Sequence, residues 1–416
     1  MWKGMDVNKH HTIQPKVDDK RNNANLLVSM SDVACKARNA AVVEIFDKKT
    51  NRSSCFPIII AYSRPSRMVV LNEKDKWKVT LEQINNREYD YVKLHRLTTS
   101  FDIGIGLPFC LHVGFNGAFV LPDLPKFRPI ENVLEQYNKF IGKLLLGGIY
   151  YEAIIPSELD HGVLNNTGYF RGHGVPDRSL AQIQATIQSK IASPIHSIDL
   201  LDPEFLEANE LHQAYKKGNG IANQIKNLSP ELVLKGTSAF VERAWAEALS
   251  NLWMGVEQVI AFLWKEHLIS KVDKGDVPIS GRREFLKDTR TWTTSTMLEL
   301  LFHKGVVNGA IYALLNKARK ARNALVHRGM TPKREDAEAA LDGLFRLIAK
   351  ICYGSEKYFE EMVNRYKTMD PITKREANYE RGPISVKEAG GIWLGPLPSI
   401  PGDGSWGDKP YEKVFP

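Results

Sequence analysis

The chain has 416 residues, of which 43% are hydrophobic and 25% charged, and its formal net charge is +8. This composition excludes a chain that is disordered throughout, and the length predicts two domains and a tail. No apolar run reaches the roughly 18 residues of a membrane span, and the N-terminus lacks the apolar core of a secretion signal. The four cysteines form no CxxC pair, which argues against a disulfide framework or a cysteine-based zinc site: Cys35, Cys55, Cys110 and Cys352. We therefore expect a reduced, cytoplasmic protein with no membrane partner.

The N-terminal part of the chain is predicted to be an α+β domain. Residues 1–25 are polar and aperiodic, which is typical of a disordered arm. Residues 26–122 contain short runs rich in β-branched and aromatic residues, separated by turn formers, and this pattern predicts a mostly antiparallel sheet. These runs are 40–47, 55–63, 67–73, 89–97, 101–115 and 117–123. Asn116-Gly117 between two apolar runs predicts a tight hairpin turn.

After Pro125 the hydrophobic period changes to that of a helix, over residues 131–154, 179–193 and 200–225. Residues 161–179 read as a loop in which His161, Arg171 and His173 lie among glycines. Two roles are open for these side chains, a ligand pocket or a plain surface loop. We assign residues 26–200 to one α+β domain, a possible sensor.

A second domain, residues 205–368, is expected to be an all-α bundle. Residues 237–268 carry a long apolar stripe from Val241 to Leu263, as a core helix would. Further helices are expected over 284–303, 306–328 and 332–366. From residue 369 onward, repeated Gly-Pro and Pro-Gly pairs with Trp393 and Trp406 predict an irregular tail, which either drapes over the domains or is loose.

The helix expected over residues 306–328 departs from a simple amphipathic pattern. Arg322 falls inside its apolar arc, where a guanidinium costs free energy unless an anion meets it. Arg319, Asn323 and His327 follow at i, i+4 and i+8 and form a polar ridge on another face. In the helix expected over residues 237–268, Glu257 is flanked by tryptophans, and a carboxylate in such a setting needs a cation.

This helix also lies in a stretch of local positive charge. Between Leu300 and Arg334 there is no Asp or Glu, although eight cations occur there: Lys304, Lys317, Arg319, Lys320, Arg322, Arg328, Lys333 and Arg334. Such a surplus attracts polyanions, and nucleic acid is the commonest carrier of phosphate. HExxH, GxxxxGK[ST] and GxSxG do not occur, so metalloprotease, P-loop and serine-hydrolase activities lack their motifs.

The residues Arg322-Asn323-Ala-Leu-Val-His327 near the end of a helix resemble the Arg, polar residue, three variable residues, His motif of HEPN domains. The upstream helix with Glu257 is similar to the HEPN helix that carries an acidic residue after an apolar stripe. The likeness covers roughly residues 235–355 and is nearest to the ApeA-like HEPN group of bacterial defence proteins. It implies an all-α bundle that dimerises through the motif, and a metal-independent endoribonuclease that needs no cofactor.

The residue types fit that chemistry. Metal-independent RNA cleavage uses the ribose 2′-hydroxyl as nucleophile, and it needs a proton shuttle near neutral pH and a cation for the charge that develops on phosphorus. His327 suits the first role because imidazole titrates near neutrality, and Arg322 suits the second. Asn323 would orient His327 or bind phosphate, and Glu257 would hold Arg322 or the imidazole.

Alternatives stay open for each of these residues. His327 near a helix end is also suited to capping carbonyls, or the motif binds RNA without cutting it. The remaining cations of this helix either bind RNA or form a solvated basic face: Lys317, Arg319, Lys320 and Arg328. Three hypotheses for the whole chain follow. The first is a bacterial antiviral or toxin-like ribonuclease that is triggered through its N-terminal domain by a phage-derived or other signal. The second is a noncatalytic HEPN scaffold, and the third is a toxin that a partner protein neutralises.

Overall fold

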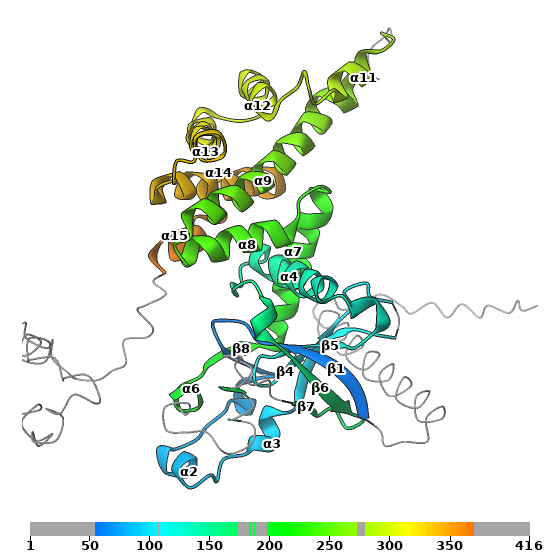
Figure 1. The fold of residues 1–416 in the computed structure, drawn as a ribbon, viewed down its shortest axis with the longest axis vertical. Helices are drawn as coiled ribbons and strands as arrows, with labels where there is room; N and C mark the ends of the chain where they lie inside the picture. The colour runs from blue at the N-terminus through cyan, green and yellow to red at the C-terminus, as the bar shows by residue number, and fades with distance from the viewer. Residues whose placement is uncertain are drawn as a thin grey trace, which may run out of the picture. The chain divides into compact units, whose positions relative to one another are not determined.

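The structure is a computed structural model, and it describes residues 55–369 except residues 107, 174–182, 185–186, 188–197 and 273–278. The described residues up to Thr368 belong to one compact unit. An antiparallel sheet and a helical region make up this unit, so the mixed α and β class expected from the sequence is confirmed. Figure 1 shows the order of these elements.

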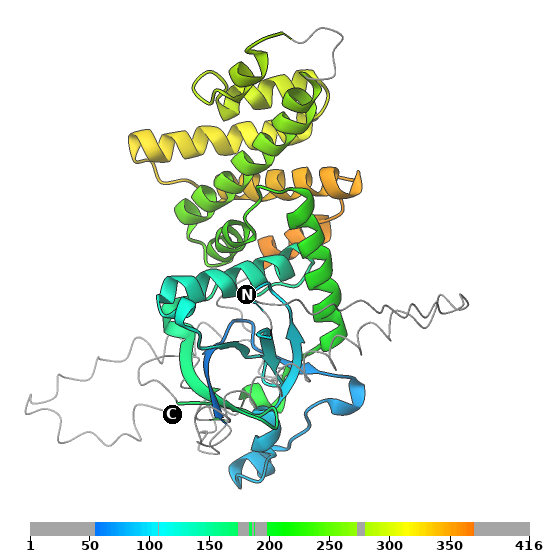
Figure 2. The same ribbon diagram turned by 90° about the vertical axis from the view of Figure 1, so that its right-hand side faces the viewer.

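Six antiparallel strands form the main sheet, in the order β3-β4-β5-β1-β6-β7. The sheet is curled, as the strands in Figure 2 show. Its strands are β1 (Cys55–Ala61), β3 (Leu97–Phe101), β4 (Leu111–Gly114), β5 (Phe119–Pro122), β6 (Leu159–Asn165) and β7 (Phe170–Gly172). The expected turn at Asn116-Gly117 joins β4 to β5, with Gly117 at a φ of 82°.

A second, two-stranded sheet pairs β2 (Arg67–Val70) in parallel with β8 (Glu204–Glu207). Around it lie the short helices α2 (Leu81–Asn85), α3 (Tyr91–Leu94) and α6 (Ile198–Leu201). Trp77, Tyr89 and Phe115 pack together here in a buried cluster. The Trp77 indole also donates a hydrogen bond of 3.0 Å to the carbonyl of Leu200.

Three predictions for the α+β part are wrong in detail. The helix expected over residues 200–225 contains strand β8, because these residues pair with β2, and helix α7 (Ala208–Gln224) begins only after it. Residues 89–97, expected to be a strand, contain α3, because Asp90 caps its first turn by accepting from the Lys93 amide. The loop expected over residues 161–179 begins as the hairpin of β6 and β7. Its turn is fixed by Asn165, whose side chain accepts from the Thr167 and Tyr169 amides.

Helix α4 (Ile130–Leu146) packs on the main sheet and confirms the first part of the helix expected over residues 131–154, but it ends eight residues earlier, at Leu146. The buried hydroxyl of Tyr137 donates to the carbonyl of Ile59 at 2.6 Å. Helices α7 (Ala208–Gln224) and α8 (Pro230–Val241) pack against α4 in turn. Gly218 allows this approach, because an ideal Cβ there would lie 1.7 Å from the carbonyl oxygen of Lys143.

The remaining helices form the C-terminal part of the unit (Figure 1). They are α9 (Trp245–Trp264), α10 (Ser270–Val272), α11 (Arg282–Lys287), α12 (Thr294–His303), α13 (Gly309–Arg328), α14 (Arg334–Tyr353) and α15 (Glu360–Thr368). Helix α9 contacts α8, α12, α13 and α14. A π-helical turn, Lys265–Ile269, connects α9 to α10.

The single helix expected over residues 237–268 is interrupted in the structure. Helix α8 ends at Val241, and Arg243 adopts a left-handed φ of 63° before α9 begins at Trp245. The amide of Ala244 then donates to the carbonyl of Ala239, which closes the end of α8. An apolar stripe does not reveal such a break, because residues on both sides of it face the same core.

The boundary expected between two domains near residue 205 separates elements that pack closely against one another. Strand β8 pairs with β2, and α7 and α8 pack on α4. Several expectations lie outside the described residues: the arm 1–25, the strand 40–47, most of the helix 179–193 and the tail 370–416 with Trp393 and Trp406. Among the helices that the structure describes, none combines the length and the apolarity that crossing a bilayer requires.

Candidate functional site

Helix α13 carries most of the residues singled out from the sequence. Asn308 starts it by accepting from the Ile311 amide at 2.9 Å, and Gly329 ends it with a left-handed φ of 64°. One face, with Ile311 and Leu315, is fully buried. This packing fixes which way the opposite, polar side of the helix points.

The cations of α13 have no carboxylate partner among the described residues. Arg319 donates from Nη2 to the side-chain oxygen of Asn316 at 2.8 Å. Arg322 donates from Nη1 to the side-chain oxygen of Asn323 at the long distance of 3.5 Å. An amide oxygen carries no charge, so both half-buried guanidinium groups keep their full attraction for an external anion.

An open cleft of about 680 Å³ lies between α9, α12 and α13. It contains four of the residues expected in the site: Glu257, Arg319, Arg322 and Asn323. Its volume falls in the range of ligand pockets. The structure thus brings together a carboxylate from α9 and two guanidinium groups and an amide from α13, residues that are more than sixty positions apart in the chain.

Glu257 is held differently from the sequence-based expectation. Its Oε1 accepts a hydrogen bond of 2.7 Å from the indole Nε1 of Trp253, one turn earlier on α9. Within the described residues it forms no ion pair with Arg322 or with His327. The buried Trp253 ring is therefore the group that orients this carboxylate at the cleft wall.

The third wall was missed by the sequence analysis. It is formed by Trp292 and by Thr293, Thr294 and Ser295 at the start of α12. Thr293 caps this helix by accepting from the Thr296 amide. The half-buried Trp292 is fixed by donating to the carbonyl of Phe285 at 2.9 Å. The run of hydroxyl residues before an apolar helix was the available signal, since such residues cap helices.

His327 lies outside the cleft. It is exposed near the end of α13, and its ring makes no hydrogen bond with the described residues. Three further cations of α13, Lys317, Lys320 and Arg328, are also exposed and outside the cleft. A single copy of the chain therefore groups Arg322, Asn323 and Glu257, but it does not add the imidazole to them.

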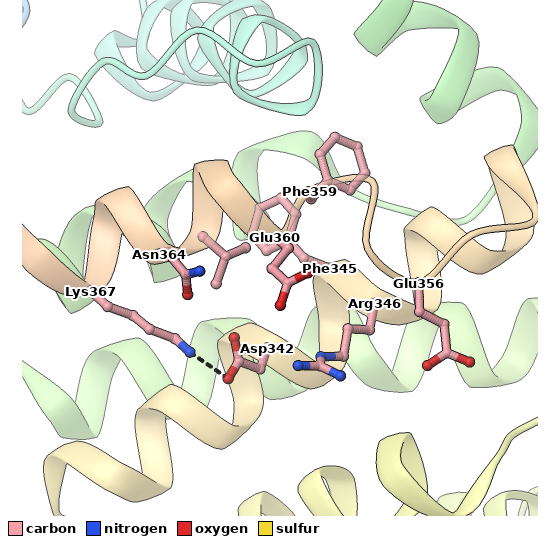
Figure 3. Close-up of a pocket in the computed structure, with 9 residues that line it drawn as sticks. Asp342, Phe345, Arg346, Glu356, Phe359, Glu360, Asn364 and Lys367 are labelled. Carbon is pink, nitrogen blue, oxygen red and sulfur yellow. Dashed lines mark hydrogen bonds and ion pairs between the residues drawn. The ribbon is translucent and has the colours of Figure 1, made fainter.

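A second cavity lies between α14 and α15 and differs in kind (Figure 3). At about 30 Å³ it is large enough for little more than a water molecule. One of its lining cations, Lys367, is already paired, since it lies 2.6 Å from Asp342 and 3.1 Å from Glu338. No group of three or more histidine, cysteine or acidic side chains suited to a metal occurs in the described part of the chain.

Comparisons with known proteins gave no match that bears on the site. No protein-family model matches the chain, and searches of curated proteins and of solved structures found no match.

Proposed function

We propose that this protein is a metal-independent endoribonuclease of the HEPN type, a bacterial antiviral or toxin-like effector that acts in the cytoplasm. The observation that carries the proposal is the convergence of Arg322, Asn323 and Glu257 in one open cleft, where no carboxylate of the described residues pairs with the guanidinium. An arginine left without an anionic partner in a concave, half-buried position is suited to bind phosphate.

In the proposed reaction the ribose 2′-hydroxyl attacks the adjacent phosphorus, and the 5′-oxygen leaves. His327 transfers the protons, and Arg322 stabilises the negative charge on the phosphoryl oxygens. Asn323 contributes a further hydrogen bond to phosphate or imidazole. The products are a 2′,3′-cyclic phosphate and a 5′-hydroxyl, and no metal ion or cofactor takes part.

The exposure of His327 supports a site shared by two copies of the chain. On one helix Arg322 and His327 are five residues apart, about 140° around the axis, and do not face one cleft. Beside His327 the large side chains of Val326 and Met330 are 56% and 53% exposed. Apolar side chains in such positions mark a contact surface. A homodimer through α13 would cover them and bring the imidazole of one copy toward a guanidinium of the other.

A second candidate is a noncatalytic RNA-binding module or scaffold that a partner protein regulates. The position of His327 outside the cleft favours it directly. In that case the cleft and the exposed cations Lys317, Lys320 and Arg328 hold RNA without cutting it.

Cleavage of total RNA in the presence of a chelator tests the proposal. Wild-type protein should cleave, and His327→Ala and Arg322→Ala should each lower the rate by about a hundredfold or more. His303→Ala is the matched control, because His303 is also exposed and lies outside the cleft. Cleavage that survives both site substitutions would refute the assignment. Toxicity on expression, relieved by the same two changes, would support an effector role.

A further inference from the structure

A second open cleft of about 400 Å³ adjoins the first along α12 and α13. Two residues, Ser295 and Arg319, line both clefts. The first cleft extends from them toward α9 and Trp292, and the second toward Tyr312 and Glu299 near the start of α13. We call the two clefts together the α12–α13 groove, and Arg319 is one of the two residues that they share.

We propose that the α12–α13 groove binds single-stranded RNA, with Arg319 contacting the phosphate between two consecutive nucleotides whose bases occupy the two clefts. This inference rests on the proposed function and names the substrate class and a binding residue for it. Arg319 has no part in the motif that resembles HEPN proteins, and from the sequence a solvated basic face was the favoured interpretation of it.

A carboxylate lines each cleft, Glu257 the first and Glu299 the second, whereas Arg319 lines both, so the charges favour a phosphate at the position that the clefts share. Arg319 is half-buried, and its hydrogen bond to the Asn316 amide oxygen leaves it with no carboxylate partner among the described residues. Ser295, the other shared residue, is in the first turn of α12, where hydroxyl and main-chain donors complement an anion. Arg322 adds a second cation farther into the first cleft.

Aromatic rings favour unpaired bases on both sides of that phosphate. In the first cleft Trp292 is fixed against Trp264, with ring centroids 4.9 Å apart. In the second, Tyr312 packs on Phe302 at 4.8 Å, and its hydroxyl donates to Glu299. Rings immobilised in this way are stacking platforms that accept any base. Bases inside a duplex are not available for such contacts, which is why the groove suits a single strand.

Binding of fluorescent oligonucleotides with 2′-O-methyl riboses tests the inference, because such RNA cannot be cleaved by 2′-hydroxyl attack. We expect a tetranucleotide to bind at least tenfold more tightly than a mononucleotide, since only the longer ligand reaches both clefts. Arg319→Ala should weaken tetranucleotide binding about tenfold and lower its salt dependence by about 0.7 in log Kd per log salt, the loss of one phosphate contact. Trp292→Ala and Tyr312→Ala should each weaken it about fivefold or more.

Arg365→Ala is the matched control, because this exposed arginine on α15 lies outside both clefts. Its affinity should stay within about twofold of wild type. Unfolding temperatures of all variants show whether a loss of affinity reflects a loss of fold. Equal effects of Arg319→Ala and Arg365→Ala in folded protein would overturn the proposal that the groove binds RNA. Equal affinity for the mononucleotide and the tetranucleotide would do so as well.

The outcomes also separate this inference from the proposed activity. Groove-dependent binding of the methylated strand without His327-dependent cleavage of ordinary RNA would uphold the groove and refute the nuclease. His327-dependent cleavage that is unaffected by Arg319→Ala, Trp292→Ala and Tyr312→Ala would do the reverse.

Discussion

Three cations of the sheet region are paired with carboxylates, whereas those of the cleft bond amide oxygens. Beside the two-stranded sheet, the buried Arg67 lies 3.0 Å from Glu204 and donates to the carbonyl of Tyr150 at 2.7 Å. Asp75 there meets both Arg96 at 2.5 Å and Lys93 at 3.3 Å. In the cleft, Arg319 and Arg322 bond amide oxygens and have no carboxylate partner in the part of the chain that the structure describes. The first set stabilises the fold, and the second remains available for a ligand.

Asp75 shows what pairing does to a group. Burial raises the pKa of its carboxyl, but the hydrogen bond from Arg96 and the charges of Arg96 and Lys93 outweigh burial, and the pKa lies below its ordinary value. An arginine without such a partner has no comparable role in stability. A half-buried cation without an anionic partner is therefore better explained by binding of a ligand than by stabilisation of the fold.

The largest expected effect compares Arg67 with Arg322. Arg67→Ala should lower the free energy of unfolding by about 3 kcal/mol, because the Tyr150 carbonyl and Glu204 lose their buried donor. Arg322→Ala should change it by less than about 1 kcal/mol, because no charge loses a partner. Urea unfolding of the two variants measures both values. Similar losses in the two variants would erase the distinction between structural and functional cations.

A somewhat smaller effect is expected where α7 meets α4 on the sheet side. Gly218→Ala should cost about 2–3 kcal/mol, because the new methyl group would collide with the Lys143 carbonyl and force the helices apart. Gly220→Ala, in the same helix, should stabilise by about 0.5–1 kcal/mol, because nothing lies within 4 Å of its Cβ position. Thermal unfolding compares the pair. A neutral Gly218→Ala would mean that this contact does not join α7 to the sheet region.

The smallest effect contrasts two histidines, the buried His112 and the exposed His327. Burial lowers the pKa of His112 to about 4, and its Nδ1 lies 2.7 Å from the Ser100 hydroxyl. Below about pH 6.5 this imidazole binds a proton in the unfolded chain, whereas in the folded chain it stays neutral until the pH approaches 4. Its stabilising contribution is complete above about pH 6.5 and declines as pH falls toward about 4, with a loss of about 2 kcal/mol by about pH 5.

Urea unfolding between pH 7 and pH 4.5 measures this dependence. His112→Gln should be less stable at pH 7 but should lose less stability on acidification than wild type. His327→Gln should follow the wild-type curve, because that side chain is exposed. Parallel curves for wild type and His112→Gln would show that burial of this imidazole does not govern the acid response.

Local patterns predicted α4 and α13 correctly because their information lies within a few turns of chain. The spacing of Ile311, Leu315 and Ala318 selects the buried face of α13, and Gly329 supplies the left-handed residue that ends it. The β6–β7 hairpin was missed because its first strand is stabilised mainly by pairing with β1, about a hundred residues earlier. Such pairing leaves little trace in the hairpin's own sequence.

The sequence by itself determined that α13 would carry Arg319, Arg322, Asn323 and His327 on a helix without nearby acids, since helical period and composition are local. Only the tertiary structure decided which of them share a cleft, because that depends on how α9 and α12 pack around α13. The bond from Trp253 to Glu257 is local, within one turn of α9, but the lack of a carboxylate partner for Arg322 among the described residues follows from the packing. Distances between side chains on different helices follow from packing of the whole core, which no single stretch of sequence specifies.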